Sequence, residues 1–391
     1  MSDFLKMTIK NLRDIDKPIA IITTLFFAFG LLNILSASSE TVVRYSQPLF
    51  FYMQRHAFFL VIGFVMFLFI INISTKKLDK ISLLLFGGAL FLNILLIIVG
   101  QEHKGNLNWF STGGQPSELA KPAIILFSAI IFETKFRRLQ DKKYSFQDNL
   151  QLLIFISAVL FLLPIIVFQI HGDAGGGGLM GLISIAIFLA SPIKKEDKTI
   201  LIGLFTALAG LSLIIMAATG TGLFGPTQVS RLTNFRDPCS DYEGTGFQVC
   251  NSFIAINEGG IFGVGLGNSA QKHSYIPDAH TDMVFAIIAE ELGFIGASLI
   301  LFFKFYLLKR ILDISKKACN IRGQYIALGF AFYMFFHTFI NLGGLFGLIP
   351  LTGVTLPFFS YGPSFTLSFI LGLALVQRVH IESVRKKIKI K

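Results

Sequence analysis

The sequence predicts an all-α, polytopic membrane protein with about ten transmembrane helices and with both termini in the cytoplasm. Hydrophobic residues make up 53% of the 391 residues, 43 of them Phe, and the mean hydropathy is +0.68. One soluble core could not bury that much apolar surface. The apolar residues form blocks of about 17–25 residues, enough to cross a hydrocarbon core of about 30 Å. The blocks lack the alternation of transmembrane β-strands, so the spans are predicted to be helical.

Ten apolar segments are expected to be the spans. They lie at 18–36, 57–73, 81–100, 118–134, 151–170, 176–192, 199–219, 282–303, 323–345 and 357–377. The first span follows a charged stretch and has no small-residue cleavage site, so we expect an uncleaved anchor. Residues 1–391 are expected to form a single transmembrane domain, with 220–281 as a large extracytoplasmic loop before the eighth helix.

Basic residues set the expected orientation. With the N-terminus inside, 27 of the 34 Lys and Arg residues fall on the inner face, six of them in 304–322. This asymmetry follows the positive-inside rule and favours an even number of spans. The net charge of +11 is therefore ascribed to topology and to anionic lipid, and no nucleic-acid partner is expected.

The three cysteines fall on both sides of the membrane. Cys319 is expected to be a free thiol in a cytoplasmic loop. Cys239 and Cys250 share the long outer loop, where a disulfide is permissible. Their spacing alone leaves paired and free thiols equally open.

Asp282 follows the long outer loop and starts an apolar helix. Thr281 or Asp282 is placed to cap that helix, which is the purely structural role. At the membrane boundary, partial desolvation would raise the pKa of the Asp282 carboxyl toward that of a general base. Glu290 and Glu291 lie deeper, where ionisable groups are costly unless they serve a function or pair with another helix, Lys121 being one candidate partner.

Three further polar clusters lie on the same outer face. Gln115–Lys121 places Glu118 and Lys121 on one helix face, as an intrahelical ion pair or as a ligand site. His171–Gly178 has four consecutive glycines, and its Asp173 is either a cap or a ligand group. Pro350–Ser364 contains three prolines and is expected to be a broken-helix segment, either lining a polar cavity or serving only as a wall.

These motifs resemble the SEDS family (shape, elongation, division and sporulation), which includes RodA and FtsW. The resemblance runs in the family's order over most of the chain, through Ser36–Ser38, Gln115–Lys121, Gly265–Lys272, Ile276–Asp282, Glu290–Gly293, Pro350–Gly353 and Ser360–Gly362. The loop sequence Gly246–Gln248, followed by GLGNSAQK, is more similar to FtsW than to RodA.

The resemblance implies an inverting peptidoglycan glycosyltransferase that polymerises lipid II into glycan strands at the outer face of the cytoplasmic membrane, for cell division. The family's essential acidic residue falls on Asp282, which would deprotonate the 4-hydroxyl of the acceptor N-acetylglucosamine. That oxygen would attack the anomeric carbon of a polyprenyl-pyrophosphate-linked donor. The partners implied are lipid II, lipid-linked glycan, a class B penicillin-binding protein, other division or elongation proteins and membrane lipids.

The departing pyrophosphate carries heavy negative charge, so cations are expected beside it. The expected substrate- and pyrophosphate-binding residues are Lys121, Glu118, Arg231, Lys272, His280 and Ser360. A divalent cation such as Mg²⁺ or Mn²⁺ is a possible cofactor, with Asp282 and Glu118 as its candidate ligands.

Several departures from the family pattern stand beside these matches. Asn108 precedes Trp109 where the family has Arg, Gly172–Gly176 lacks the family's proline and threonine, and Pro363 replaces a glycine. They leave Asp282 and its flanks intact. A flippase for lipid-linked precursors and an inactive division scaffold are the alternatives. A flippase would show ionisable groups reachable from both faces, whereas here they cluster outside.

Overall fold

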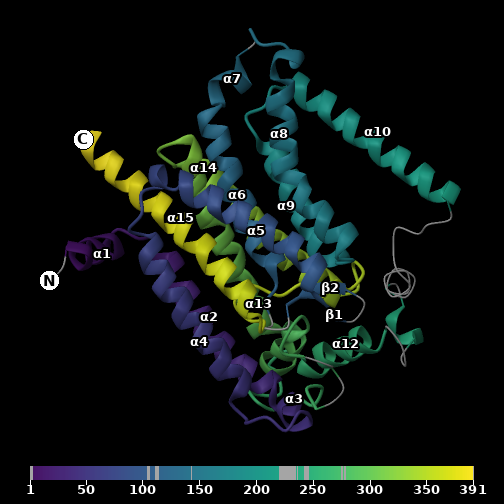
Figure 1. Cartoon of the computed structure of the whole chain (residues 1–391). Helices are drawn as coiled ribbons and strands as arrows, with labels where there is room; N and C mark the ends of the chain where they lie inside the picture. Colours follow the sequence, from purple (N-terminus) through teal and green to yellow (C-terminus); the bar gives the residue numbers. More distant parts are fainter. Residues whose placement is uncertain are drawn as a thin grey trace.

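The structure is a computed structural model that describes residues 3–103, 106–110, 114–141, 143–219, 235, 237–241, 246–273, 276 and 279–390. Its long helices form a bundle (Figure 1), and each of them coincides with an expected span. They are α2 (Lys17–Ala37), α4 (Phe51–Ile70), α5 (Asp79–Val99), α6 (Pro116–Thr134), α8 (Phe146–Ile165) continued by the π-turn η2 (Ile166–Ile170), α9 (Ala174–Ala190), α10 (Lys195–Thr219), α13 (Val284–Lys316), α14 (Ile321–Leu345) and α15 (Pro363–Ile390).

Seven of these helices are long and apolar enough to cross a membrane: α2, α4, α5, α8 with η2, α13, α14 and α15. The protein is therefore a helical, multi-pass membrane protein. Helix α9 is apolar but shorter, and α6 carries Glu118, Lys121 and Glu133. The expected number of ten spans stays a prediction.

Shorter elements connect the bundle. They are α1 (Asp3–Arg13), α3 (Ser39–Arg44), η1 (Thr75–Lys77), α7 (Phe136–Gln140), η3 (Pro238–Asp241), α12 (Phe247–Gly259) and the antiparallel pair β1 (Gln101–His103) and β2 (Asn106–Trp109). The two-stranded pair was not foreseen in the all-α prediction. It lies just beyond the apolar span α5, and the Leu107 amide donates to the His171 carbonyl at 2.9 Å.

Two predicted spans differ most from their bounds in the structure. The span predicted at 282–303 continues as helix to Lys316, and Lys304 is only 3% exposed, so its assignment to an inner loop was wrong. The span predicted at 357–377 begins only at Pro363 and runs to Ile390. Hydropathy marks where the bilayer lies, whereas backbone hydrogen bonding decides where a helix starts and stops.

Helix α13 is interrupted at Gly293, whose φ of 67° and ψ of −172° are not helical. The segment 260–265 replaces the lost helical bonds. The amides of Val264 and Gly265 donate to the carbonyls of Glu290 and Glu291 at 3.0 Å, and the Phe294 amide donates to the Gly260 carbonyl at 2.9 Å. Irregular backbone is tolerated at membrane depth when protein groups satisfy it in this way.

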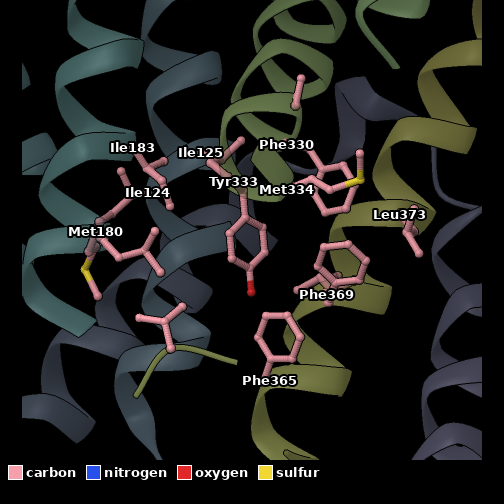
Figure 2. Packing of buried hydrophobic residues seen from close by; sticks show 14 of the residues in the cluster. Ile124, Ile125, Met180, Ile183, Phe330, Tyr333, Met334, Phe365, Phe369 and Leu373 are labelled. Atoms are coloured by element: carbon pink, nitrogen blue, oxygen red, sulfur yellow. The ribbon is translucent and has the colours of Figure 1, made fainter. Parts of the chain in front are cut away.

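The core of the bundle lies between α6, α9, α14 and α15. Figure 2 shows Tyr333 of α14 between Ile125 of α6 and Phe365 and Phe369 of α15. The Tyr333 hydroxyl is 3.0 Å from the Ser368 hydroxyl, so this buried ring also has a polar partner. The packing is therefore both aromatic and hydrogen bonded.

The segments expected on the inner face meet at one end of the bundle. Asn11 donates to the Ile71 carbonyl at 3.1 Å, and Arg322 pairs with Asp79 at 2.9 Å and with Glu133 at 2.8 Å. Both chain ends are tied to the same inner turn, because Glu382 of α15 accepts from the Thr75 amide at 2.8 Å. This arrangement agrees with termini on one face.

Cys239 and Cys250 form a disulfide that joins η3 to α12, which decides between the two states left open above. Cys319 is a free thiol. Helix α10 runs away from the bundle in Figure 1.

Gly293→Ala is expected to destabilise the protein by about 2–4 kcal/mol, because L residues are strained at this φ and the new Cβ would collide with backbone. An ideal Cβ at 293 would lie 2.3 Å from the Gly263 amide nitrogen. Thermal unfolding of the purified protein in detergent measures the effect.

Gly87→Ala is the matched control for this substitution. Gly87 lies inside α5, and nothing approaches within 4 Å of its ideal Cβ, so stability should be unchanged or slightly raised. A Gly293→Ala protein as stable as the Gly87→Ala protein would contradict the described break.

Candidate functional site

The residues Pro350–Gly362 form a non-helical segment between α14 and α15, here called the re-entrant segment. Phe358 and Phe359 of this segment are buried, and an ideal Cβ on Gly30 of α2 would lie 2.2 Å from the Phe358 carbonyl oxygen. The segment therefore enters the bundle and contacts α2 closely. This agrees with the predicted broken-helix segment.

Three buried side chains satisfy the backbone of the re-entrant segment. The Asn341 amide donates to the Val354 carbonyl at 2.8 Å, the His337 ring nitrogen lies 3.2 Å from the Thr355 carbonyl, and the Lys304 ammonium donates to the Pro357 carbonyl at 3.2 Å. In an apolar environment, each carbonyl without a hydrogen-bond partner would cost on the order of several kcal/mol, as does any buried polar group that is left unpaired. These side chains therefore fix the segment's path.

Asp282 lies against this segment. Asn341 donates to the Asp282 carbonyl at 2.6 Å with the same amide group that holds Val354, and the Thr281 hydroxyl donates to Oδ1 of Asp282 at 2.9 Å. Oδ2 lies 3.8 Å from the point where a Cβ on Gly353 would stand. Gly353 has a φ of 73°, a conformation that favours glycine.

The cap of helix α13, one of the two roles left open for Thr281 and Asp282, falls on another residue. The N-cap residue is Met283, and it makes no side-chain capping bond. The helix starts at Val284, and the Ala286 amide donates to the Met283 carbonyl at 3.0 Å instead. The Asp282 carboxylate is thus half-buried at the outer end of α13 and is directed at Thr281 and Gly353.

The glycine-rich cluster lies behind the re-entrant segment. An ideal Cβ on Gly175 would lie 2.3 Å from the Thr352 carbonyl oxygen, so α9 approaches this segment as closely as backbone can. Asp173 caps α9, because its Oδ1 accepts from the Gly176 amide at 2.8 Å. Of the two roles left open for Asp173, the structure shows the cap.

The Gln115–Lys121 cluster contacts α15. The Gln115 amide donates to the Ser364 hydroxyl at 3.2 Å, and the Ser368 hydroxyl donates to the Glu118 carbonyl at 2.7 Å. Lys121 is 1% exposed and pairs with Glu118 of its own helix at 2.6 Å. Lys121 therefore has an intrahelical partner, and the suggested pair with Glu290 or Glu291 was wrong.

Glu290 and Glu291 hold the outer loop instead. The Glu290 carboxylate accepts from the Ala270 amide at 2.6 Å and from the Ser269 hydroxyl at 2.5 Å. Glu291 pairs with Lys272 at 3.6 Å, and Lys272 also donates to the Ser36 hydroxyl at 3.1 Å. Lys272, expected beside pyrophosphate, is thus buried in a network between α2, α13 and the loop.

Aromatic rings surround the residues next to Asp282. The His280 ring lies 4.5 Å from that of Tyr52 and 5.5 Å from that of Tyr361, and the Tyr361 amide donates to the His280 carbonyl at 2.8 Å. The Ser360 hydroxyl accepts from the Leu356 amide at 2.7 Å, which shapes the re-entrant segment. Sequence reasoning missed Tyr52, Lys304, His337 and Asn341; a polar residue inside an apolar span was the available signal for the last three.

Two further expectations concern Arg231 and a metal ion. Arg231 is outside the described residues. Within the described ranges, no three His, Cys, Asp or Glu side chains gather to hold a metal ion, and Asp282 and Glu118 form no such group. A groove of about 130 Å³ between α13 and α14 is lined mainly by apolar residues with Lys304 at its wall, and none of the expected site residues lines it.

The chain matches known proteins over nearly its full length. The model of the cell cycle protein family FTSW_RODA_SPOVE matches residues 17–385. The stage V sporulation protein E of Bacillus subtilis (strain 168) is 34% identical over 93% of this chain and 96% of its own. The probable peptidoglycan glycosyltransferase FtsW of Coxiella burnetii is 32% identical over 94% of this chain and 96% of its own.

Solved structures share the fold. A chain from a peptidoglycan synthase complex, described for its structural coordination of polymerization and crosslinking, has a TM-score of 0.71 and 25% identity over 94% of this chain and 98% of its own. The rod shape determining protein RodA of Thermus thermophilus has a TM-score of 0.63 and 24% identity over 94% of this chain and 96% of its own.

Asn341→Leu is expected to lower stability by about 1–3 kcal/mol, because the backbone carbonyls of Asp282 and Val354 lose their shared donor. It should also reduce the rate of the catalysed reaction by roughly tenfold or more, because Asp282 is then less firmly positioned. Thermal unfolding and a single-turnover rate measure the two effects. Thr338→Val, three residues away on α14, removes only a bond to the Met334 carbonyl and should keep the wild-type rate. Equal rates for the two variants would contradict the role given to Asn341.

Lys121→Met is expected to destabilise the protein by about 3–5 kcal/mol, because it leaves the Glu118 carboxylate buried without its partner. Adding Glu118→Gln should recover most of that loss, since the uncompensated charge is then gone. Thermal unfolding of the two single variants and the double variant measures the coupling. Strictly additive losses would show that the two side chains do not act as a pair.

Proposed function

Because this chain belongs to the FTSW_RODA_SPOVE family of cell cycle proteins, we propose that its FtsW-type bundle polymerises peptidoglycan by acting on lipid II at the outer face of the membrane. It is a peptidoglycan glycosyltransferase, like the relatives of that name that it matches over nearly their full length. One observation carries the proposal for the site: the half-buried Asp282 has its backbone carbonyl held by Asn341 of α14 and its carboxylate beside Gly353 of the re-entrant segment, at the end of the bundle opposite the basic one.

Asp282 is the proposed general base. Its carboxylate takes the proton from the acceptor 4-hydroxyl as the oxygen bonds to the anomeric carbon of the donor. The bond from that carbon to the pyrophosphate oxygen breaks, and its electron pair leaves with the polyprenyl pyrophosphate. A single displacement of this kind inverts the anomeric configuration. The Thr281 hydroxyl, which donates to Oδ1 of Asp282, would hold the carboxylate in one orientation.

The support is uneven among the other proposed ligands. His280 precedes Asp282 by two residues and contacts Tyr361 of the re-entrant segment. Lys121 and Lys272 are buried in ion pairs with Glu118 and Glu291, which favours a role in holding helices and loop rather than direct contact with the leaving group. Ser360 shapes the re-entrant segment through its bond with Leu356. Arg231 stays a proposal from the sequence.

The two candidate ligands of the proposed divalent cation, Asp282 and Glu118, belong to no group of three or more His, Cys, Asp or Glu side chains in the described residues. Oε1 of Glu118 accepts from Lys121, and Oε2 is buried without a hydrogen-bond partner in the part of the chain that the structure describes, so this oxygen is the one that the fold leaves open to a cation. A Mg²⁺ ion that bound here would take most of its ligands from pyrophosphate oxygens and water, as this ion commonly does. No step of the mechanism is assigned to it.

The cell inner (cytoplasmic) membrane is the proposed location, with the basic end inside. A class B penicillin-binding protein is the proposed partner, supported by the likeness to a chain of a peptidoglycan synthase complex. Division is the proposed process, since FtsW is the name that recurs among the relatives. The flippase alternative is less favoured, because the buried charges at the inner end are tied into ion pairs such as those of Arg322.

Asp282→Ala should abolish glycan-strand formation, a loss of at least about a hundredfold, because no other group would accept the hydroxyl proton. The measurement is the polymerisation of lipid II by purified protein with its transpeptidase partner, resolved by strand length. Unchanged thermal unfolding of the variant would show that the fold survives.

Asp237→Asn is the matched control, since Asp237 is exposed in the outer loop and the variant also removes one negative charge. It should polymerise at the wild-type rate. Wild-type strands from Asp282→Ala would remove Asp282 from the role of base, and translocation of lipid II without strands from the wild-type protein would favour the flippase.

A further inference from the structure

Arg55 lies at the outer end of α4, one turn after Tyr52, and its side chain is exposed. No acidic side chain in the described part of the chain lies within ion-pair distance of its guanidinium. By contrast, Lys121 and Lys272, two of the three cations expected beside the leaving group, are buried against carboxylates, and the third, Arg231, lies outside the described residues. Arg55 is therefore a cation that the fold leaves at the outer surface.

The first two turns of α4 pack on the residues that flank Asp282. The Tyr52 ring lies 5.1 Å from the Tyr361 ring and 4.5 Å from the His280 ring, and the His56 ring lies 5.9 Å from that of Tyr361. Arg55 lies between Tyr52 and His56 in the sequence, on the same two turns of helix. These ring contacts fix Arg55 beside the segment that carries Asp282.

The electrostatics of Tyr361 agree with this placement. The Arg55 charge acts on the Tyr361 hydroxyl. A phenol is protonated at neutral pH and can donate a hydrogen bond. A cation and a neutral donor thus stand together at the rim of the proposed site.

We propose that Arg55 binds the pyrophosphate of the polyprenyl-linked donor and stabilises the polyprenyl pyrophosphate as it leaves; this inference rests on the proposed function. Guanidinium presents a planar fork of donors that matches phosphate oxygens. As the bond from the anomeric carbon to oxygen breaks, the electron pair passes to the pyrophosphate, and Arg55 stays protonated throughout. The Tyr361 hydroxyl donates to the same group of oxygens.

The test separates binding from turnover. A fluorescent polyprenyl pyrophosphate is titrated against the full chain in nanodiscs, and the matching polyprenyl alcohol reports the tail alone. Arg55→Gln should weaken pyrophosphate binding by roughly 10-fold to 100-fold, the usual worth of charged hydrogen bonds, and leave alcohol binding unchanged. Arg55→Lys should fall between, because it keeps the charge and loses the fork.

Arg44→Gln is the matched control, since Arg44 is also an exposed arginine of the same outer face, on α3. It should bind the pyrophosphate as the wild-type protein does. Wild-type affinity in Arg55→Gln, or an equal loss in Arg44→Gln, would overturn the assignment.

Polymerisation of lipid II, measured on the same preparations, distinguishes this inference from the proposed function. Polymerisation by the wild-type protein with unchanged pyrophosphate affinity in Arg55→Gln refutes the Arg55 site alone. Selective loss of pyrophosphate binding in Arg55→Gln, with no polymerisation by the wild-type protein, supports the site and refutes the enzyme. Absence of both pyrophosphate binding and polymerisation in the wild-type protein refutes both.

Discussion

The structure depends on the rule that a backbone polar group at membrane depth must find a partner within the protein. The helices satisfy their own backbone, but the re-entrant segment Pro350–Gly362 does not. Its carbonyls are paired by Asn341, His337 and Lys304, polar side chains placed inside otherwise apolar helices. Because Asn341 also binds the Asp282 carbonyl, the same requirement positions the carboxylate. Stability and the proposed chemistry thus share one set of contacts.

The charged residues of the outer half divide into those that hold the fold and those that face the surface. Lys121 and Lys272 are each matched to a carboxylate, which is how ionisable groups become tolerable in an apolar setting. Glu290 uses its oxygens on the amide and hydroxyl groups of the loop 269–271, which fastens that loop to α13. Arg55 and Asp282 have more access to solvent, and the chemistry is assigned to them.

Much of the proposed site could be predicted from the sequence, because polar clusters are easily recognised between the apolar segments of a membrane protein. The four outer clusters were predicted to lie on one face, and Gly175, Thr352 and Gly353 link three of them around Asp282. The partners inside each cluster were not predictable. Glu118 is three residues from Lys121, whereas Glu290 and Glu291 are too far along the chain for their sequence positions to show whether they contact it. Only the packing of the helices decides which glutamate pairs with Lys121.

By itself, the sequence determined the class of fold and the order of the helices, and it singled out Asp282 as the proposed base, since hydropathy and local motifs are properties of consecutive residues. The tertiary structure decided the break at Gly293, the burial of Lys304, the pairing of Cys239 with Cys250 and the contact of Tyr52 with Tyr361. Each of these joins residues from different helices or loops. Such contacts depend on how helices pack, and the distance along a chain does not report distance in space.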